Sequence, residues 1–283
     1  MVLTMVDCHM HMVLDGLYWK DAIDRHREHP REDYIRDVLK TYRALGYTYL
    51  RDGGDRWGVG RRARQLAAPM GITYRTPLSP LCKEGCYGAF IGETFRNEKE
   101  FAALAEKQKK NGADFIKIMI SGLMDFDNPG RLMQEGPNET EIAYMVSVAK
   151  DLGMSVMAHC NGVMAAVAAA KAGVDSVEHG AYLNKEALCA MKEAGVVWVP
   201  TLSTIGNLLG KGRYPDKAVE EILESALANV KAYKDLGGLV ACGSDAGAWA
   251  VPHGCETEKH WLHKAGLTDA EVQKANREIM KRF

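Results

Sequence analysis

Two histidines, His9 and His11, lie two residues apart in an apolar segment near the start of the chain. On a β-strand, the period of two residues would point both imidazoles to the same side. Two imidazoles that converge on one point can hold a divalent metal ion such as zinc. An isolated His-x-His pair is also compatible with two ordinary polar residues at a strand end, so the pair needs support from elsewhere in the chain.

Lys117 lies within a second apolar segment, in the run Asp-Phe-Ile-Lys-Ile-Met-Ile. On a strand it would share a face with Phe115 and Met119, and the strands of a parallel barrel are buried on both faces. A buried ammonium is costly unless it is paired. A lysine that loses its proton can add carbon dioxide to form a carbamate, whose two oxygens can bridge two metal ions. The alternative is an ammonium paired with an interior acid such as Asp245, and the sequence leaves both open.

Three further ligand-type residues follow apolar runs, namely His159, His179 and Asp245. Taken singly, each histidine could be a buried or capping residue, and Asp245 could cap the next helix. Six such residues at strand ends are hard to explain as six separate structural features, and imidazole and carboxylate groups suit divalent metals. We therefore predict one metal site formed by the following residues: His9, His11, Lys117, His159, His179 and Asp245.

The elements that must position these residues alternate between short apolar runs and amphipathic helical stretches, a pattern typical of repeated βα units. Eight strands close a (β/α)8 barrel, and we predict strands over 6–11, 47–52, 72–78, 115–120, 155–160, 176–179, 196–202 and 239–244. Several long links follow strands, where a barrel builds its active-site mouth. They are residues 52–59, 79–97, 121–138 and 203–215.

Helix signals agree with this division. Asn138 is predicted to open a helix that ends at Gly153, and Asn161 to open an Ala-rich helix that ends at Gly173. A doubly wound open sheet is the alternative fold, but its Gly-rich phosphate turn is missing after the first strand. We predict an α/β fold, a (β/α)8 TIM barrel, as a single domain over residues 1–283.

Composition limits the partners. The formal net charge is -1, which favours neither nucleic acid nor an anionic membrane as a partner. The first residues lack the basic and apolar regions of a secretion signal, and no apolar run is long enough to span a bilayer. Seven scattered cysteines suit reduced thiols. We therefore expect a cytoplasmic protein that acts on a small molecule, and a homo-oligomer only from the general tendency of soluble enzymes.

The metal-ligand pattern resembles that of the amidohydrolase superfamily, most closely the branch of metal-dependent Xaa-Pro dipeptidases, arginine carboxypeptidases and imidazolonepropionases. The segments that carry the resemblance cover nearly the whole chain: residues 6–11, 50–54, 112–117, 158–162, 172–180 and 242–247. Most members of that branch flank the barrel with a small β-sandwich made from both chain ends. Here the first predicted strand begins at about residue 6, so we expect the barrel without this companion domain.

The resemblance implies a role for each ligand. His9, His11 and Asp245 would hold one divalent ion and His159 and His179 a second, with Lys117 as an N6-carboxylated bridge. Zinc is the expected metal, with manganese as the other choice. A hydroxide that bridges the two ions would attack an amide or peptide C–N bond of a dipeptide or N-acyl amino acid. Asp245 would move the proton from this water to the departing amine.

Substrate contacts are predicted from the loops. An arginine can clamp a carboxylate in a bidentate contact, and the candidates for the substrate are Arg51, Tyr182 and Thr201. Two other functions stay open. One is a mononuclear enzyme for cyclic amides or imidazolones, or a deaminase, and the other is a non-catalytic barrel that binds a ligand.

Overall fold

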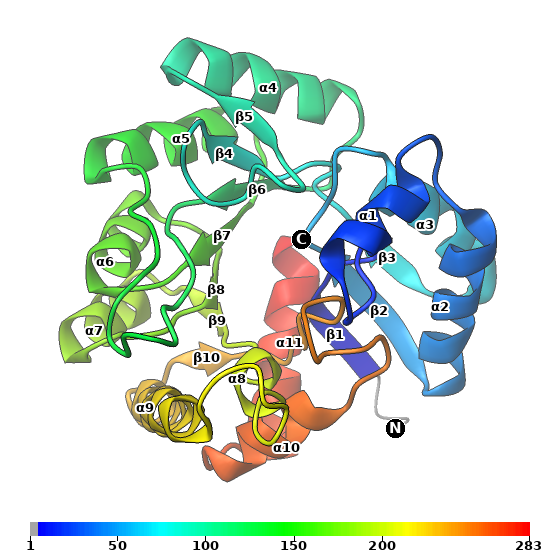
Figure 1. The fold of residues 1–283 in the computed structure, drawn as a ribbon. Helices are drawn as coiled ribbons and strands as arrows, with labels where there is room; N and C mark the ends of the chain where they lie inside the picture. Colours follow the sequence, from blue (N-terminus) through cyan, green and yellow to red (C-terminus); the bar gives the residue numbers. More distant parts are fainter. Residues whose placement is uncertain (1–4) are drawn as a thin grey trace.

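The structure is a computed structural model and describes residues 5–283. A ring of parallel strands surrounds the centre of the molecule, with helices outside it (Figure 1). The ring strands are β1 (Met5–Met10), β2 (Tyr47–Asp52), β3 (Thr73–Arg75), β6 (Ile116–Met119), β7 (Val156–Cys160), β8 (Ser176–His179), β9 (Val197–Val199) and β10 (Leu239–Val240). This arrangement confirms the predicted α/β fold of the TIM-barrel type.

Hydrogen bonds join the two sheets of the ring at both seams. One sheet has the order β1-β2-β3, and the other runs β10-β9-β8-β7-β6 and continues into two short outer strands, β4 (Leu81–Lys83) and β5 (Glu93–Phe95). At the first seam the Cys8 amide donates to the Cys242 carbonyl at 2.9 Å, and at the second the Asp114 amide donates to the Thr76 carbonyl at 3.0 Å. The strand ends are therefore held around one common axis.

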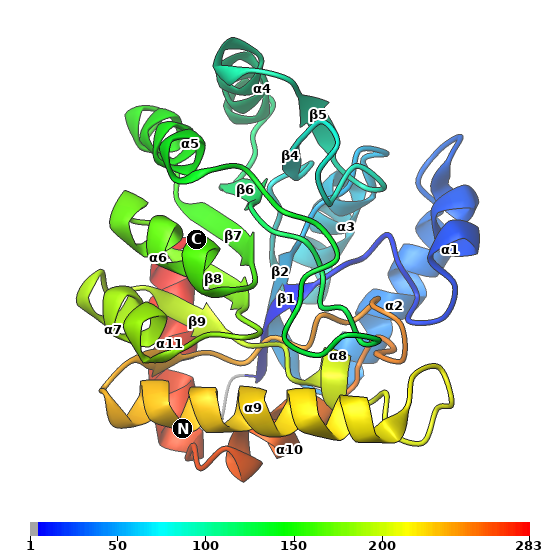
Figure 2. The same ribbon diagram turned by 60° about the vertical axis from the view of Figure 1, so that its left-hand side comes forward.

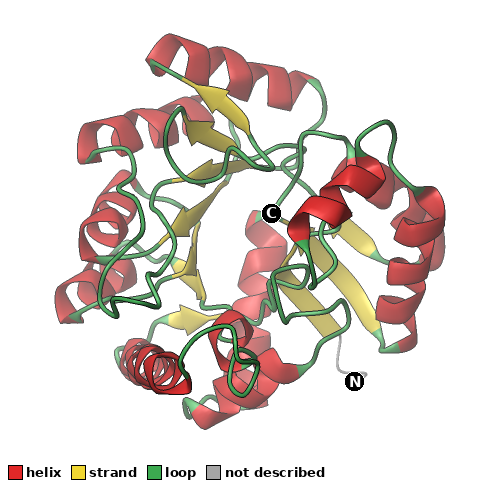
Figure 3. Ribbon diagram, in the orientation of Figure 1, coloured by secondary structure: helices red, strands yellow, loops and turns green. Residues whose placement is uncertain are grey.

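Most helices form an outer layer around the strands, whereas the last helix, α11, is seen through the centre of the ring (Figure 3). The helices are α1 (Trp19–His26), α2 (Glu32–Ala44), α3 (Val59–Ala67), the 3-10 helix η1 (Ala68–Met70), α4 (Glu98–Lys110), α5 (Glu139–Asp151), α6 (Val163–Ala172), α7 (Lys185–Glu193), α8 (Ser203–Gly206), α9 (Asp216–Asp235), α10 (Thr257–Lys264) and α11 (Asp269–Arg282). Between residues 5 and 283, none of them is long and apolar enough to cross a membrane.

Strand β6 shows how the layers divide its side chains. Ile116, Ile118 and Ile120 pack into the large cluster between strands and helices, whereas Phe115 packs into the smaller cluster inside the ring. This alternation is the one predicted from the sequence, and it turns Lys117 toward the interior, where it is 1% exposed. Both faces of the strand are buried, as expected for a parallel barrel.

The two ends of the barrel differ. The long loops and α1 lie at the carboxyl ends of the strands, while α11 lies toward the other end (Figures 1 and 2). The ring of Phe283, just after α11, contacts Phe115 at 5.1 Å and lies 4.3 Å from the guanidinium of Arg51. This contact places Phe283 against the interior of the barrel, at the end opposite the long loops (Figure 2).

Of the two predicted helix starts, one is confirmed and the other is wrong. Asn138 opens α5 as predicted, and together with Glu141 it forms a capping box. Asn161 does not cap α6, which begins after Gly162 with no side-chain cap. The Asn161 side chain instead donates to the Gly122 carbonyl at 3.0 Å and accepts from the Ala181 amide at 2.9 Å. The predicted opening of this helix at Asn161 is thus wrong, because the side chain ties two mouth loops together.

Candidate metal centre

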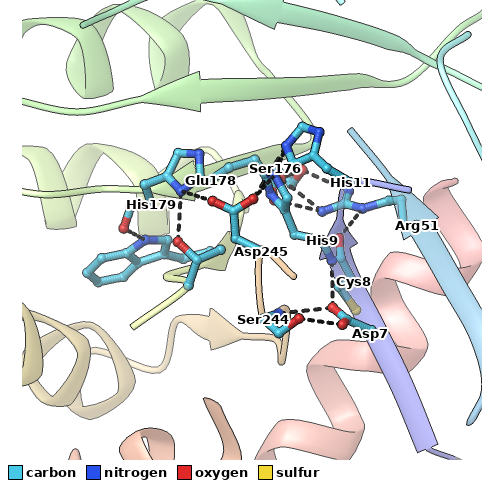
Figure 4. A network of polar contacts seen from close by, with 12 residues as sticks. Asp7, Cys8, His9, His11, Arg51, Ser176, Glu178, His179, Ser244 and Asp245 are labelled. Atoms are coloured by element: carbon cyan, nitrogen blue, oxygen red, sulfur yellow. Dashed lines mark hydrogen bonds and ion pairs between the residues drawn. The ribbon is translucent and has the colours of Figure 1, made fainter. Parts of the chain in front are cut away.

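His9, His11 and Asp245 converge at one end of the barrel (Figure 4). His9 and His11 lie at and just after the carboxyl end of β1, and Asp245 lies in the segment that follows β10. One ligand atom from each lies within 4.8 Å of the others, and all three side chains are buried. Asp245 Oδ1 is 3.5 Å from His9 Nε2 and 3.4 Å from His11 Nε2. The chain after β10 reaches this position because the Asp245 amide donates to the His9 carbonyl at 2.7 Å.

The donor set fits a divalent cation. Among residues 5–283, the buried Asp245 Oδ1 has no hydrogen-bond partner, and the same holds for His11 Nδ1. A buried carboxylate oxygen without a donor is destabilising, and a cation beside it removes that cost. Two imidazole nitrogens and one carboxylate oxygen are common zinc ligands.

A buried network fixes the orientation of His9. Its Nδ1 lies 2.7 Å from Glu178 Oε2, so the other ring nitrogen is directed to Asp245 and His11. The guanidinium of Arg51 donates to both Glu178 oxygens, at 2.9 and 3.0 Å, and to the Ser176 hydroxyl at 3.0 Å. Such a carboxylate behind a metal-ligating histidine sets its tautomer and orientation.

His179 and His159 lie on the other side of Asp245. The His179 ring lies 5.0 Å from the His9 ring and 4.6 Å from the His159 ring. His179 Nδ1 is 3.8 Å from Asp245 Oδ2 and 2.7 Å from the Thr201 hydroxyl. The structure thus brings all four predicted histidines to one place.

Lys117 is almost fully buried, and its charge acts on His11 and His159. Burial lowers the pKa of its ammonium, while the charges of Glu178 and Asp245 act in the opposite direction. The neutral amine required for carbamate formation is therefore easier to reach than for an exposed lysine. Burial also raises the pKa of Asp245.

The imidazoles are in the charge state that metals bind. Burial, together with the positive charge of Lys117, lowers the pKa of His11 and of His159 to about 3. Burial also holds the pKa of His9 and His179 well below the ordinary value. Neutral imidazoles are therefore present at pH 7 without prior deprotonation.

Backbone strain is concentrated at the same strand ends. His179, Thr201 and Asp245 have positive φ angles of 70°, 49° and 57°. Residues other than glycine rarely adopt this region, and such strain is typical of functional sites that the surrounding fold holds in place. Here the strained residues turn the chain sharply at the end of β8 and after β9 and β10.

Two of the three predicted substrate contacts need correction. Arg51 is 0% exposed and bound to Glu178 inside the barrel, so it cannot reach a substrate at the mouth. Thr201 is also fully buried, with its hydroxyl on His179. Tyr182 is only half-buried beside the mouth, and its hydroxyl has no hydrogen-bond partner within residues 5–283.

The sequence reasoning missed Glu178, Ser176 and Asp7. Ser176 and Glu178 share the inward face of β8, whereas Val177 packs outward. Alternation alone would have placed them opposite the predicted ligand His179, whose positive φ angle departs from strand geometry. Asp7 accepts hydrogen bonds from the Ser244 amide and hydroxyl, at 2.9 and 2.6 Å, and thereby anchors the chain next to Asp245. No local pattern indicates this contact, since its partners are far apart in the sequence.

Replacement of Thr201 by valine tests the role of its hydroxyl. The variant keeps the shape of the side chain but removes the hydrogen bond to His179 Nδ1. Loss of such a partner typically lowers metal affinity roughly 10- to 100-fold. Chelator competition would measure this, with Thr94→Val on the exposed surface of β5 as the matched control. Equal affinities for the two variants would show that Thr201 does not orient His179.

Comparison with known proteins yields one family and several relatives. The model of the amidohydrolase family matches residues 2–272. An ochratoxinase of Aspergillus niger is 28% identical over 304 residues, covering 95% of this chain and 62% of the relative. An uncharacterised protein of Mycobacterium tuberculosis is 32% identical over 193 residues, which is 66% of this chain and 51% of that protein. The chain thus spans about half to two thirds of the length of these relatives.

Solved structures share the fold. A Xaa-Pro dipeptidase with bound methionine superposes with a TM-score of 0.80 at 22% identity, covering 99% of this chain and 75% of that one. The crystal structure of A. niger ochratoxinase gives a TM-score of 0.78 at 23% identity, with 95% and 68% of the two chains covered. These similarities show that nearly the whole chain shares the fold of the two structures.

Proposed function

Because the chain belongs to the amidohydrolase family, we propose that it is a metal-dependent hydrolase of a C–N bond in a small amide, such as a dipeptide or an N-acyl amino acid. The observation that carries this proposal is the buried group of His9, His11 and Asp245, with an unpartnered Asp245 oxygen among the described residues. The names of the similar proteins, Xaa-Pro dipeptidase and ochratoxinase, support an amide as the substrate class.

In this proposal two divalent ions, zinc or manganese, are held by six residues. His9, His11 and Asp245 hold the first ion. His159 and His179 would hold the second, and an N6-carboxylated Lys117 would be the sixth ligand. When bound, the ions polarise the substrate carbonyl and lower the pKa of the attacking water. The lowered pKa of the buried Lys117 ammonium supports the carbamate.

Asp245 is the proposed proton carrier. Its carboxylate takes a proton from the water whose oxygen adds to the amide carbon. It then gives that proton to the nitrogen as the C–N bond breaks, so the products are a carboxylic acid and an amine. Burial raises the pKa of Asp245, which suits a group that must both accept and return a proton near neutral pH.

A mononuclear enzyme is the second candidate, acting on a cyclic amide or imidazolone or as a deaminase. The observation that favours it is that only His9, His11 and Asp245 form a tight group of histidine and carboxylate ligands in residues 5–283. The two candidates differ in metal content and in the role of Lys117.

Metal content is the first measurement. Protein purified without chelators should carry about two equivalents of zinc or manganese per chain, measured by plasma mass spectrometry. Chelation should abolish amide hydrolysis, and either metal together with bicarbonate should restore it. Lys117→Ala should retain no more than one equivalent, because it lacks the carbamate ligand. One equivalent in both proteins would support the mononuclear candidate, and none after reloading would support a ligand-binding barrel.

A further inference from the structure

A row of aromatic rings leads from the surface of the barrel mouth to His159. Trp19 meets Phe90 edge-on, with ring centroids 5.5 Å apart. Phe90 is 5.7 Å from Tyr87, whose ring lies 4.7 Å from the ring of His159. The row therefore connects exposed surface with one of the proposed metal ligands.

The rings of this row are partly accessible to solvent. Trp19 is 45% exposed, and Phe90 and Tyr87 are half-buried. Leu17 and Tyr18, just before Trp19, are 71% and 57% exposed. The Lys20 ammonium lies 5.4 Å over the Trp19 ring, so one face of this ring has a neighbour. Clustered exposed apolar groups of this kind mark binding sites on soluble proteins.

The loop that carries Tyr87 and Phe90 is held firmly against the barrel. Gly88, between them, has a φ of +114°, and a Cβ atom there would lie 2.8 Å from Met119 Cγ. The Arg56 amide donates to the Ile91 carbonyl at 2.9 Å, which ties the same loop to the chain after β2. The two rings are therefore preorganised at the mouth, which lowers the entropic cost of binding.

We propose that Trp19, Phe90 and Tyr87 form the wall that receives an aromatic group of the substrate, so that the preferred substrate is an amide bearing an aromatic ring. This inference rests on the proposed amide hydrolysis. Aromatic rings associate in edge-on and offset stacked arrangements, as the row itself does, and a flat substituent extends it at little entropic cost. Because the row ends at His159, a group lying on it is adjacent to the proposed metal centre.

The test compares matched amides and matched variants. The metal-loaded protein is assayed with N-acetylglycine, N-benzoylglycine and N-acetylphenylalanine, which place an aromatic ring on neither side, on the acyl side or on the amine side. Trp19→Ala and Phe90→Ala remove one ring each. Leu236→Ala is the control, because Leu236 is 40% exposed and follows α9, at the amino end of β10.

At least one aromatic amide should exceed N-acetylglycine in kcat/KM by about tenfold or more. Each ring deletion should lower kcat/KM for that aromatic amide by about three- to tenfold more than it lowers kcat/KM for N-acetylglycine, whereas Leu236→Ala should change neither, and metal content should stay within about twofold of wild type in all variants. No preference for aromatic amides, or equal losses on all three substrates, would overturn the inference and leave amide hydrolysis intact.

If none of the amides is cleaved, a binding experiment tests the aromatic wall independently of the reaction. Calorimetric titration of N-benzoylglycine should then give a dissociation constant that Trp19→Ala and Phe90→Ala raise and Leu236→Ala does not. Such a result would support the aromatic wall although the proposed reaction had failed. Equal binding by all four proteins, or none, would overturn the wall as well.

Discussion

Replacement of Asp245 by asparagine is expected to lower kcat/KM for amide hydrolysis by about 10²- to 10⁴-fold, the range typical for loss of a general acid–base group. The amide side chain keeps the size and one oxygen of the carboxylate, but it cannot accept the proton of water or return it to the amine. Its neighbours His9 and His11 are unchanged. Activity with the best amide, together with metal content, measures the effect.

The metal measurement separates two causes of a lower rate. If Asp245→Asn keeps its metal and loses activity, the loss is in proton transfer, whereas loss of both points to a ligand role alone. Asp235→Asn is the matched control, because Asp235 is the exposed last residue of α9 and pairs with Lys231 and Lys234. A verified activity that survives in the double variant His9→Ala with Asp245→Ala would contradict the catalytic assignment.

Alternation along strands could be predicted from the sequence because it is a local property. The isoleucines of β6 identify its outer face and so direct Lys117 inward, and the structure confirms this. Strands β2 and β8 have the predicted bounds, Tyr47–Asp52 and Ser176–His179. The ends of the other strands differ by a few residues, because strand pairing depends on neighbours that the local sequence does not contain.

Long-range pairing could not be predicted. Arg51 looked like a mouth residue because it lies next to the carboxyl end of β2, yet its partner Glu178 lies 127 positions further along the chain. Strands β4 and β5 have three residues each, too few for a period of two to stand out. Thr201 does lie near the predicted metal ligands, but the predicted contact with the substrate is wrong, because its hydroxyl contacts His179.

Replacement of Arg51 by methionine is expected to lower the free energy of unfolding by about 3–5 kcal/mol, because it leaves the Glu178 carboxylate buried without its cation. Both side chains are 0% exposed, so water cannot take the place of the guanidinium. The variant also loses the contact from Arg51 Nε to the Cys8 carbonyl, at 2.6 Å. Urea unfolding of metal-free protein would measure the change without a contribution from metal binding.

Arg36→Met is the matched control, since Arg36 pairs with Glu32 at the surface, where both side chains are nearly half exposed, and its loss should cost less than about 1 kcal/mol. Adding Glu178→Met to Arg51→Met should recover part of the stability, because an apolar pair removes the uncompensated charge. The double variant should still bind metal more weakly than wild type, because His9 Nδ1 loses its carboxylate partner. If Arg51→Met were no less stable than Arg36→Met, the Ser176 hydroxyl and His9 would be sufficient to hold Glu178, and Arg51 would have no part in keeping the metal-ligand cluster in place.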